Sequence, residues 1–216
     1  QTVEIAGASP VTQEAAAAVG LGPDAPAAIV RDIRFPRIDA AANDPNAQRF
    51  NQLVAQQPQF APEDQTEEQV RYSIVYAGPD LISVKFDTYQ NTLGAAHPDN
   101  SMKAVTVVMT GGARTLGVED VFRPDGGWEN FVTQRAMEQL TRQFREYGFA
   151  PPARDVRETA TKPHLWLISD QGLTILFPPY SFGGPHAMGG AEVSIPWADL
   201  RPYLNPRAPR PIGAQA

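Results

Sequence analysis

Two stretches of alternating apolar and polar residues, separated by a three-residue turn, constrain the fold more than any other feature of the sequence. The first is "QVRYSIVYAG", residues 69–78, and the second is "LISVKFDTYQN", residues 81–91. Alternation with period two is typical of half-buried strands, and Gly78-Pro79-Asp80 has the composition of a turn. The apolar side chains expected on one face of this antiparallel pair are Tyr72, Ile74, Tyr76, Ile82, Val84 and Phe86.

Further strands outnumber the helices. Apolar and β-branched patterns predict a strand at 27–38, a strand in the segment 101–116 that ends in Gly111-Gly112, a hairpin at 162–180, and a last strand within 191–204 that runs into a short helix. Helices are expected at 44–57, where Asp44 precedes Pro45, and at 127–147. This order predicts an α+β fold: an antiparallel sheet with helices packed on one face, and a long Gly-rich loop between the late strands.

The helix over 127–147 has the clearest periodicity. Its expected buried face is Phe131, Met137, Leu140 and Phe144, and Gly148 follows as a stop signal. Helix 44–57 is expected to bury Phe50, Leu53 and Val54.

The two ends of the chain have a different composition from the middle. Residues 1–28 are rich in Ala, Gly and Pro, which predicts either a flexible linker or a loose first strand. Residues 29–204 carry all the remaining patterned segments and are expected to form one domain. Residues 205–216 read as a Pro-rich C-terminal tail.

Charge and composition exclude several classes of protein. The chain has 18 basic and 24 acidic residues, a formal net charge of −6, and no cysteine. This balance argues against a general nucleic-acid binder, and no apolar run reaches the roughly 20 residues that a membrane helix needs. Disulfides and thiolate metal sites are excluded. Because the chain starts at Gln1 rather than Met, we expect an exported protein, periplasmic or at the cell surface, and a lipid anchor upstream of Gln1 is compatible with this.

The stretch "FPPYSFGGPHAMGG", residues 177–190, interrupts a strand pair with two Gly-Gly steps and two aromatic residues. Glycine allows positive φ angles and close backbone approach, so this loop can turn sharply more than once. Tyr180 and Phe182 would either close the edge of the sheet or stand exposed. Exposed aromatic side chains on such a loop are common recognition elements.

Catalytic and metal-binding motifs have little support. His97, His164 and His186 do not have the spacing of a metal motif, so no metal ion or cofactor is expected. Ser181 is not in a Gly-x-Ser-x-Gly elbow, although Ser181, Asp87 and His97 or His186 could form a triad if the fold joined them. Glu119 and Asp120 are expected to cap a helical turn before Val121 rather than to act as a glycosidase pair.

The order of these motifs resembles the RsiV-like family, the extracellular domains of lysozyme-sensing anti-sigma factors and related exported domains. The resemblance spans roughly residues 29–204 and rests on five segments in sequence: "IRFPRI" with the "FNQLV" helix, "LISVKFDTYQNTLGAAHP", "AVTVVMTGGARTLGVEDVF", "LWLISDQGLTILFPPYSFGGPHAMGG" and "AEVSIPWADLRPYL". The chain shows neither a sigma-factor-binding segment nor a deacetylase domain, so only a binding or sensing module is implied.

The resemblance implies binding to a c-type lysozyme, another basic envelope protein or peptidoglycan. The acidic charge would complement a basic partner, with Asp80, Asp87, Asp99, Glu119 and Asp120 at the rim. The candidate binding residues are Tyr180, Ser181, Phe182, His186, His97 and Asp99. The alternative is an exported hydrolase that acts on cell-wall or peptide material through Ser181, His97 and His186.

Overall fold

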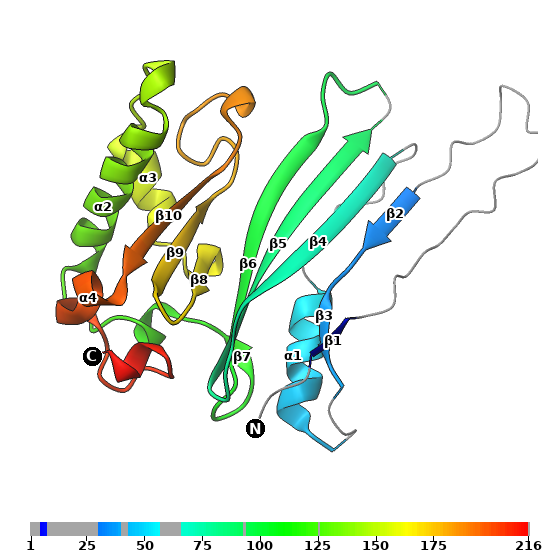
Figure 1. Cartoon of the computed structure of the whole chain (residues 1–216), viewed down its shortest axis with the longest axis vertical. Helices are drawn as coiled ribbons and strands as arrows, with labels where there is room; N and C mark the ends of the chain where they lie inside the picture. The colour runs from blue at the N-terminus through cyan, green and yellow to red at the C-terminus, as the bar shows by residue number, and fades with distance from the viewer. Residues whose placement is uncertain are drawn as a thin grey trace, which may run out of the picture.

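The fold is built from two stacked sheets with helices on the outer faces, together with a short two-stranded sheet (Figure 1). The structure is a computed structural model and describes residues 5–7, 30–39, 43–56, 66–92, 94–124 and 126–215. The predicted α+β class and the mostly antiparallel pairing are confirmed. The expected linker over 1–28 lies outside the described residues, apart from residues 5–7.

The larger sheet has five strands in the order β2-β4-β5-β6-β7. They are β2 (Val30–Ile33), β4 (Thr66–Ala77), β5 (Leu81–Thr92), β6 (Asp99–Val108) and β7 (Arg114–Thr115). All neighbours are antiparallel except β2 and β4, which are parallel. The predicted hairpin is β4 and β5, which contain a register shift between Ile74 and Tyr76. Tyr72 and Tyr76 pack against two different clusters of buried residues, and Ile74 is 38% exposed, so the apolar face expected for β4 is not continuous.

One predicted strand is divided in the structure, and another ends close to its predicted end. Within the predicted strand 27–38, residues 30–38 form β2 and then β3 (Pro36–Ile38), which pairs with β1 (Ile5–Gly7) instead of the large sheet. Pro36 lacks the N–H that a continuous ladder would use. In the segment 101–116, β6 ends at Val108, shortly before the predicted end at Gly111 and Gly112, and β7 follows the turn. The φ angles of these two glycines, 70° and 101°, favour glycine.

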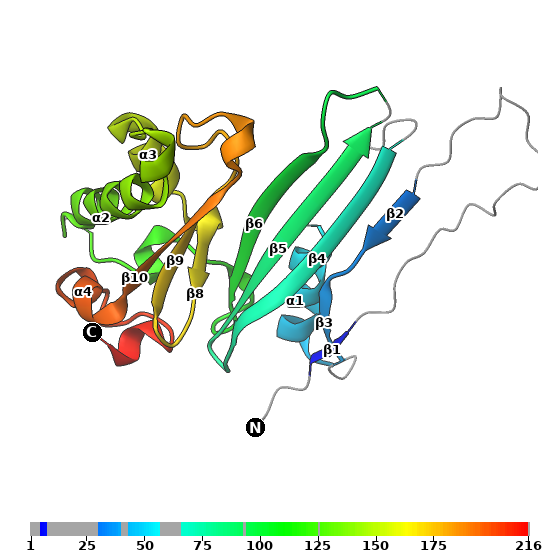
Figure 2. The ribbon, with the colours of Figure 1, turned by 45° about the horizontal axis from the view of Figure 1, so that its top comes forward.

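Helix α1 (Pro45–Ala55) covers one face of the large sheet (Figure 2). Asp44 caps it by accepting hydrogen bonds from the N–H groups of Asn46 and Ala47. The Asn51 side chain bonds both the N–H and the C=O of Ile38, which attaches α1 to β3. The predicted Phe50, Leu53 and Val54 are buried against the sheet.

The smaller sheet has three antiparallel strands in the order β10-β9-β8. They are β8 (Trp166–Ile168), β9 (Gly172–Phe177) and β10 (Ala191–Pro196). Helices α2 (Trp128–Gln143) and α3 (Ala153–Ala160) cover its outer face, and α4 (Trp197–Leu200) follows β10. Trp128, Val132, Ala136 and Leu140 form the buried stripe of α2, so the expected Phe131 and Met137 lie at its margin.

The two sheets face each other through a small apolar cluster and a buried set of hydroxyl groups. Ala104, Leu165, Leu167 and Leu176 form the cluster. Beside it, Thr106 Oγ1 lies 2.8 Å from Ser83 Oγ and donates to the carbonyl of Trp166 at 2.9 Å. The N–H of Ile168 donates to Ser83 Oγ at 3.0 Å. The backbone C=O of Trp166 and N–H of Ile168, at the outer edge of β8, therefore have hydrogen-bond partners in side chains of the large sheet.

The C-terminal segment packs against the domain instead of forming the expected loose tail. Asn205 bonds the backbone of Val121 through its N–H and that of Glu119 through its side chain. Ile212 is fully buried in the main core. The prolines of this segment predicted a tail, but burial of the apolar Ile212 side chain holds the segment against the domain.

Candidate functional site

The Gly-rich loop between β9 and β10, residues 178–190, is anchored by Phe182. This side chain is fully buried, with its ring stacked on Phe144 at 5.0 Å and edge-on to Phe177 at 6.3 Å. Phe182 was a candidate binding residue, but the structure places it in the core. It holds the loop in place and offers no surface to a partner.

Tyr180 is the side chain that the loop presents to solvent, because it is 58% exposed. Its φ angle is 69°, in the left-handed region that bulky residues rarely adopt. Hydrogen bonds fix the backbone on both sides: the N–H of Ser181 donates to the carbonyl of Pro178 at 3.1 Å, and Thr159 Oγ1 donates to the carbonyl of Ser181 at 2.7 Å. The loop thus presents an aromatic ring from a constrained backbone.

The remaining candidate residues do not form one site. Ser181 Oγ is buried and has no hydrogen-bond partner among the described atoms. His97 is exposed in the loop before β6, where its Nδ1 lies 3.0 Å from the carbonyl of Pro98. Asp99 is the exposed first residue of β6. The side chain of His186 lies outside the described atoms, and its backbone belongs to the 3-10 helix η4 (His186–Met188).

A groove of about 470 Å³ separates the Gly-rich loop from the large sheet. Asp87, Thr88, Asn100, Ser101 and Met102 line it on the sheet side, and Pro179, Ala187, Gly189 and Gly190 line it on the loop side. The loop approaches closely here, since a Cβ added at Gly190 would meet the Met102 side chain at 2.5 Å. Met102 therefore marks the contact between loop and sheet.

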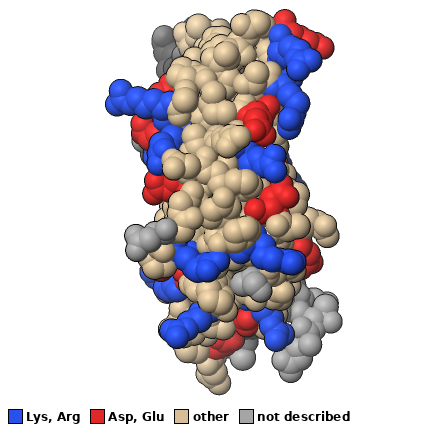
Figure 3. Space-filling model, turned by 90° about the vertical axis from the view of Figure 1, so that its left-hand side faces the viewer, with Lys and Arg blue, Asp and Glu red and all other residues tan. Residues whose placement is uncertain are grey.

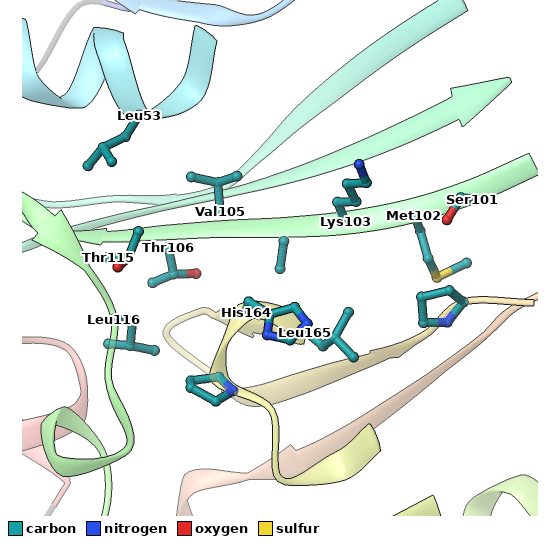
Figure 4. Close-up of a pocket in the computed structure, with 13 residues that line it drawn as sticks. Leu53, Ser101, Met102, Lys103, Val105, Thr106, Thr115, Leu116, His164 and Leu165 are labelled. Carbon is teal, nitrogen blue, oxygen red and sulfur yellow. The ribbon is translucent and has the colours of Figure 1, made fainter. Parts of the chain in front are cut away.

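A second groove of about 480 Å³ continues along β6 and also includes Ser101 and Met102 (Figure 4). Leu53 of α1 lies on one side of β6, and His164 and Leu165 lie on the other. His164 and Leu165 belong to the 3-10 helix η3 (Pro163–Leu165), which precedes β8. Burial, with a smaller contribution from the Lys162 charge, lowers the pKa of His164 below its ordinary value.

Ion pairs surround the loop end of these grooves. Lys85 Nζ lies 2.9 Å from a carboxylate oxygen of Asp87 and 2.9 Å from one of Glu192, so it bridges β5 and β10. Burial disfavours the charge of Lys85, but its bonds to Glu192 and Asp87 prevail and raise its pKa. Two carboxylates share one ammonium here, which leaves this end of the groove acidic.

Asp120 was expected at an acidic rim, but it is only 8% exposed. Its carboxylate accepts two bonds of 2.6 Å from Arg114 and one of 2.7 Å from the N–H of Gly117. Burial alone would raise the pKa of Asp120, whereas these bonds hold it below the ordinary value. The predicted capping role is confirmed, in the 3-10 helix η1 (Val118–Asp120), and the residue is not available to a partner.

The helical face of the protein carries no single-sign patch. Figure 3 shows basic and acidic side chains interspersed across the face formed by α2 and α4. Arg135, for example, pairs with both Glu138 and Asp199. Among the described side chains, no three His, Asp or Glu residues gather as a metal site would require. No described helix has the length and apolar character needed to cross a membrane.

Two features of this region were not predicted. Helix α3, whose Thr159 holds the loop backbone, has few apolar residues, but its buried Val156, Thr159 and Ala160 recur at helical spacing, and this short pattern was the available signal. The groove along β6 exists because β6 lies next to the edge of the large sheet. The alternation of apolar and polar residues predicts strands but not their order in the sheet, so it could not predict this groove. The indication available from sequence was the short strand at Arg114–Thr115 after a double glycine.

Comparisons with known proteins give a family for part of the chain. No curated protein matches. The chain is similar to the crystal structure of a DUF3298 family protein from Pseudomonas aeruginosa PAO1, with 13% identity, a TM-score of 0.60 and 94% of each chain covered. It is also similar to a DUF3298 family member from Bacteroides fragilis NCTC 9343, with 13% identity, a TM-score of 0.55 and 87% of each chain covered. At this identity the likeness shows the fold alone.

The family model described as "Protein of unknown function (DUF3298)" matches residues 119–198, which run from η1 into α4. This segment contains the whole of the smaller sheet, helices α2 and α3, and the Gly-rich loop. Residues 119–198 therefore match the DUF3298 family model, in a chain with the fold of solved DUF3298 proteins.

Proposed function

We propose that this chain is a non-catalytic binding domain of the cell envelope that recognises a basic protein, with a c-type lysozyme as the first partner to test. The observation that carries the proposal is Tyr180, an exposed aromatic side chain held at a φ angle of 69° on an anchored loop. Exposed aromatic residues on rigid supports supply much of the binding energy in protein interfaces. The resemblance to the RsiV-like family supplies the partner class.

The charges beside the loop support a basic partner. Asp87 lines the groove with loop residues, and Glu192 follows the loop in β10. Their side chains are 54% and 44% exposed, and they share Lys85, whose side chain is 20% exposed. Such an acidic rim raises the rate of encounter with a cationic protein, and the effect weakens as salt is added. The alternative of a hydrolase has less support, because the Oγ of Ser181, its candidate nucleophile, is buried and has no hydrogen-bond partner among the described atoms.

Titration calorimetry with a c-type lysozyme tests this function. We expect binding that weakens between low and physiological salt, and a Tyr180→Ala variant that binds about 30-fold more weakly, as loss of a hot-spot aromatic residue does. Ile74→Ala is the matched control, because Ile74 is also a large exposed apolar residue but lies in β4. The absence of heat at micromolar concentrations in both buffers rejects lysozyme as the partner. Equal losses in the two variants reject the loop as the contact.

A further inference from the structure

The outer edge of β6 is open along most of its length. On one side β6 pairs with β5 from Asp99 to Val108, whereas on the other side β7 pairs only with Val107 and Val108. The N–H of Leu116 extends this short ladder by donating to the carbonyl of Thr106 at 2.9 Å. Among the described residues, no strand pairs with β6 on this side between Asp99 and Val105.

Alternation along the strand determines which backbone groups face the open edge. Because the Thr106 carbonyl points toward β7, the N–H and C=O groups of Ala104, Met102 and Asn100 point to the same side. The intervening residues, such as Lys103, direct their backbone groups to β5. The open edge is therefore a row of donors and acceptors that continues the ladder begun by β7.

This edge lies inside the grooves described above (Figure 4). Residues Ser101 to Thr106 line the groove of about 480 Å³, and Asn100 to Met102 line the groove of about 470 Å³. The opposite walls contain Pro163, Pro178 and Pro179, which have no N–H to compete for the backbone acceptors of β6. A strand of seven residues, about 23 Å long at 3.3 Å per residue, would span Thr106 to Asn100.

We propose that the β6 edge binds an extended peptide, which adds as a strand antiparallel to β6 and continues the row of β7. Regularly spaced backbone donors and acceptors in an open groove are the recognition surface for β-strand addition. A second copy of this chain fits less well, since its own α1 and η3 flank its β6 edge and would meet the same elements here.

The lining of the grooves specifies the chemistry of the peptide. Near Thr106 the walls are apolar, with Leu53 and Leu116 on the groove surface, which favours apolar side chains at that end. Near Asn100 the groove contains Asp87, and Asp99 lies exposed beside it. In the antiparallel direction this acidic end receives the C-terminal end of the peptide, so a Lys or Arg is expected there.

The test uses the whole chain, labelled with ¹⁵N, and an acetylated and amidated heptapeptide of alternating valine and threonine that ends in lysine. We expect the amide signals of Met102 and Ala104 to shift and their hydrogen exchange to slow at least tenfold, while the Lys103 amide changes little. Replacing the terminal lysine of the peptide by glutamate should weaken binding.

Variants separate the backbone from the side chain. Met102→Pro removes an N–H that faces the groove but no hydrogen bond to β5, and it should weaken peptide binding about tenfold. Met102→Ala keeps that N–H, and its peptide affinity should fall clearly less. If the proline variant does not fold, a heptapeptide N-methylated at alternate residues makes the same test from the ligand side, and it should fail to bind.

Three outcomes overturn the proposal. The first is no change at Met102 and Ala104 with millimolar peptide. The second is concentration-dependent change at the same amides without peptide, which assigns the edge to a second copy. The third is the same change with a chitin tetrasaccharide but not with the peptide. Tyr180→Ala should bind the peptide like the parent, so failure of the lysozyme proposal leaves this one standing.

Discussion

The two sheets of this protein differ in how far the rest of the chain buries them. In the smaller sheet every residue of β8 and all but one of β9 are buried, and exposed positions are confined to alternate residues of β10. The larger sheet has exposed positions in β4 and an open edge along β6. The family model matches the segment that contains the smaller sheet. The comparison indicates that the smaller sheet and its helices form the stable frame, and that the larger sheet supplies accessible backbone.

The largest expected difference comes from truncating an apolar residue in each region. Leu140 is fully buried between α2 and the smaller sheet, so Leu140→Ala should lower the free energy of unfolding by about 2–5 kcal/mol. Ile74→Ala, at a 38% exposed position of the larger sheet, should cost less than about 1 kcal/mol. Urea unfolding measures both. Equal losses would contradict the division into frame and accessible sheet.

The next expected effect concerns the contact between the sheets. Thr106→Val removes the hydroxyl that donates to the Trp166 carbonyl and meets Ser83, leaving buried polar groups without partners. We expect a loss of about 1–3 kcal/mol by thermal or urea unfolding. Thr115→Val, at an exposed position of β7, is the control and should change the unfolding free energy by less than about 0.5 kcal/mol.

A pH-dependent effect is expected at the link between β7 and η1. The folded-state pKa of Asp120 lies below its ordinary value of 3.8, so the stability it adds is complete well above pH 3.8 and is lost as the pH falls through the folded-state pKa. Asp120→Asn should cost about 1–2 kcal/mol at pH 7. The difference between parent and variant should shrink on acidification. A difference that stays constant down to pH 2 would show that the carboxylate charge is not involved.

The smallest expected effect is a gain. Tyr180 adopts a φ angle of 69°, which glycine tolerates better, so Tyr180→Gly should raise the free energy of unfolding by up to about 1 kcal/mol. Tyr180→Ala keeps the Cβ and should show no such gain. Differential scanning calorimetry on both variants would check this. A loss in the glycine variant would mean that the tyrosine ring contributes more by packing than its backbone costs.

Local patterns predicted the elements better than their assembly. The Asp44-Pro45 start of α1 and the Gly78-Pro79-Asp80 turn are local signals, and both are found in the structure. The stacking of the two sheets depends on contacts between β6 and β8, such as the hydrogen bond between Thr106 and Trp166, which are 60 residues apart in the sequence, and no local periodicity reports such contacts. In the loop, alternating aromatic residues did not show which ring enters the core: Phe182 is buried and Tyr180 exposed because Phe144 and Phe177 surround the former.

The hydroxyl contacts of Ser83 and Thr106 also restrict how the two sheets can slide past each other. Apolar side chains such as Ala104 and Leu167 can pack in several offsets at similar energy. The N–H of Ile168 and the carbonyl of Trp166 meet the hydroxyls in one offset, and a slip of one residue would bring the groups of Leu167, which face β9, in their place. These two hydroxyl groups thus select a single alignment of the two sheets, whereas the apolar contacts alone would allow several alignments.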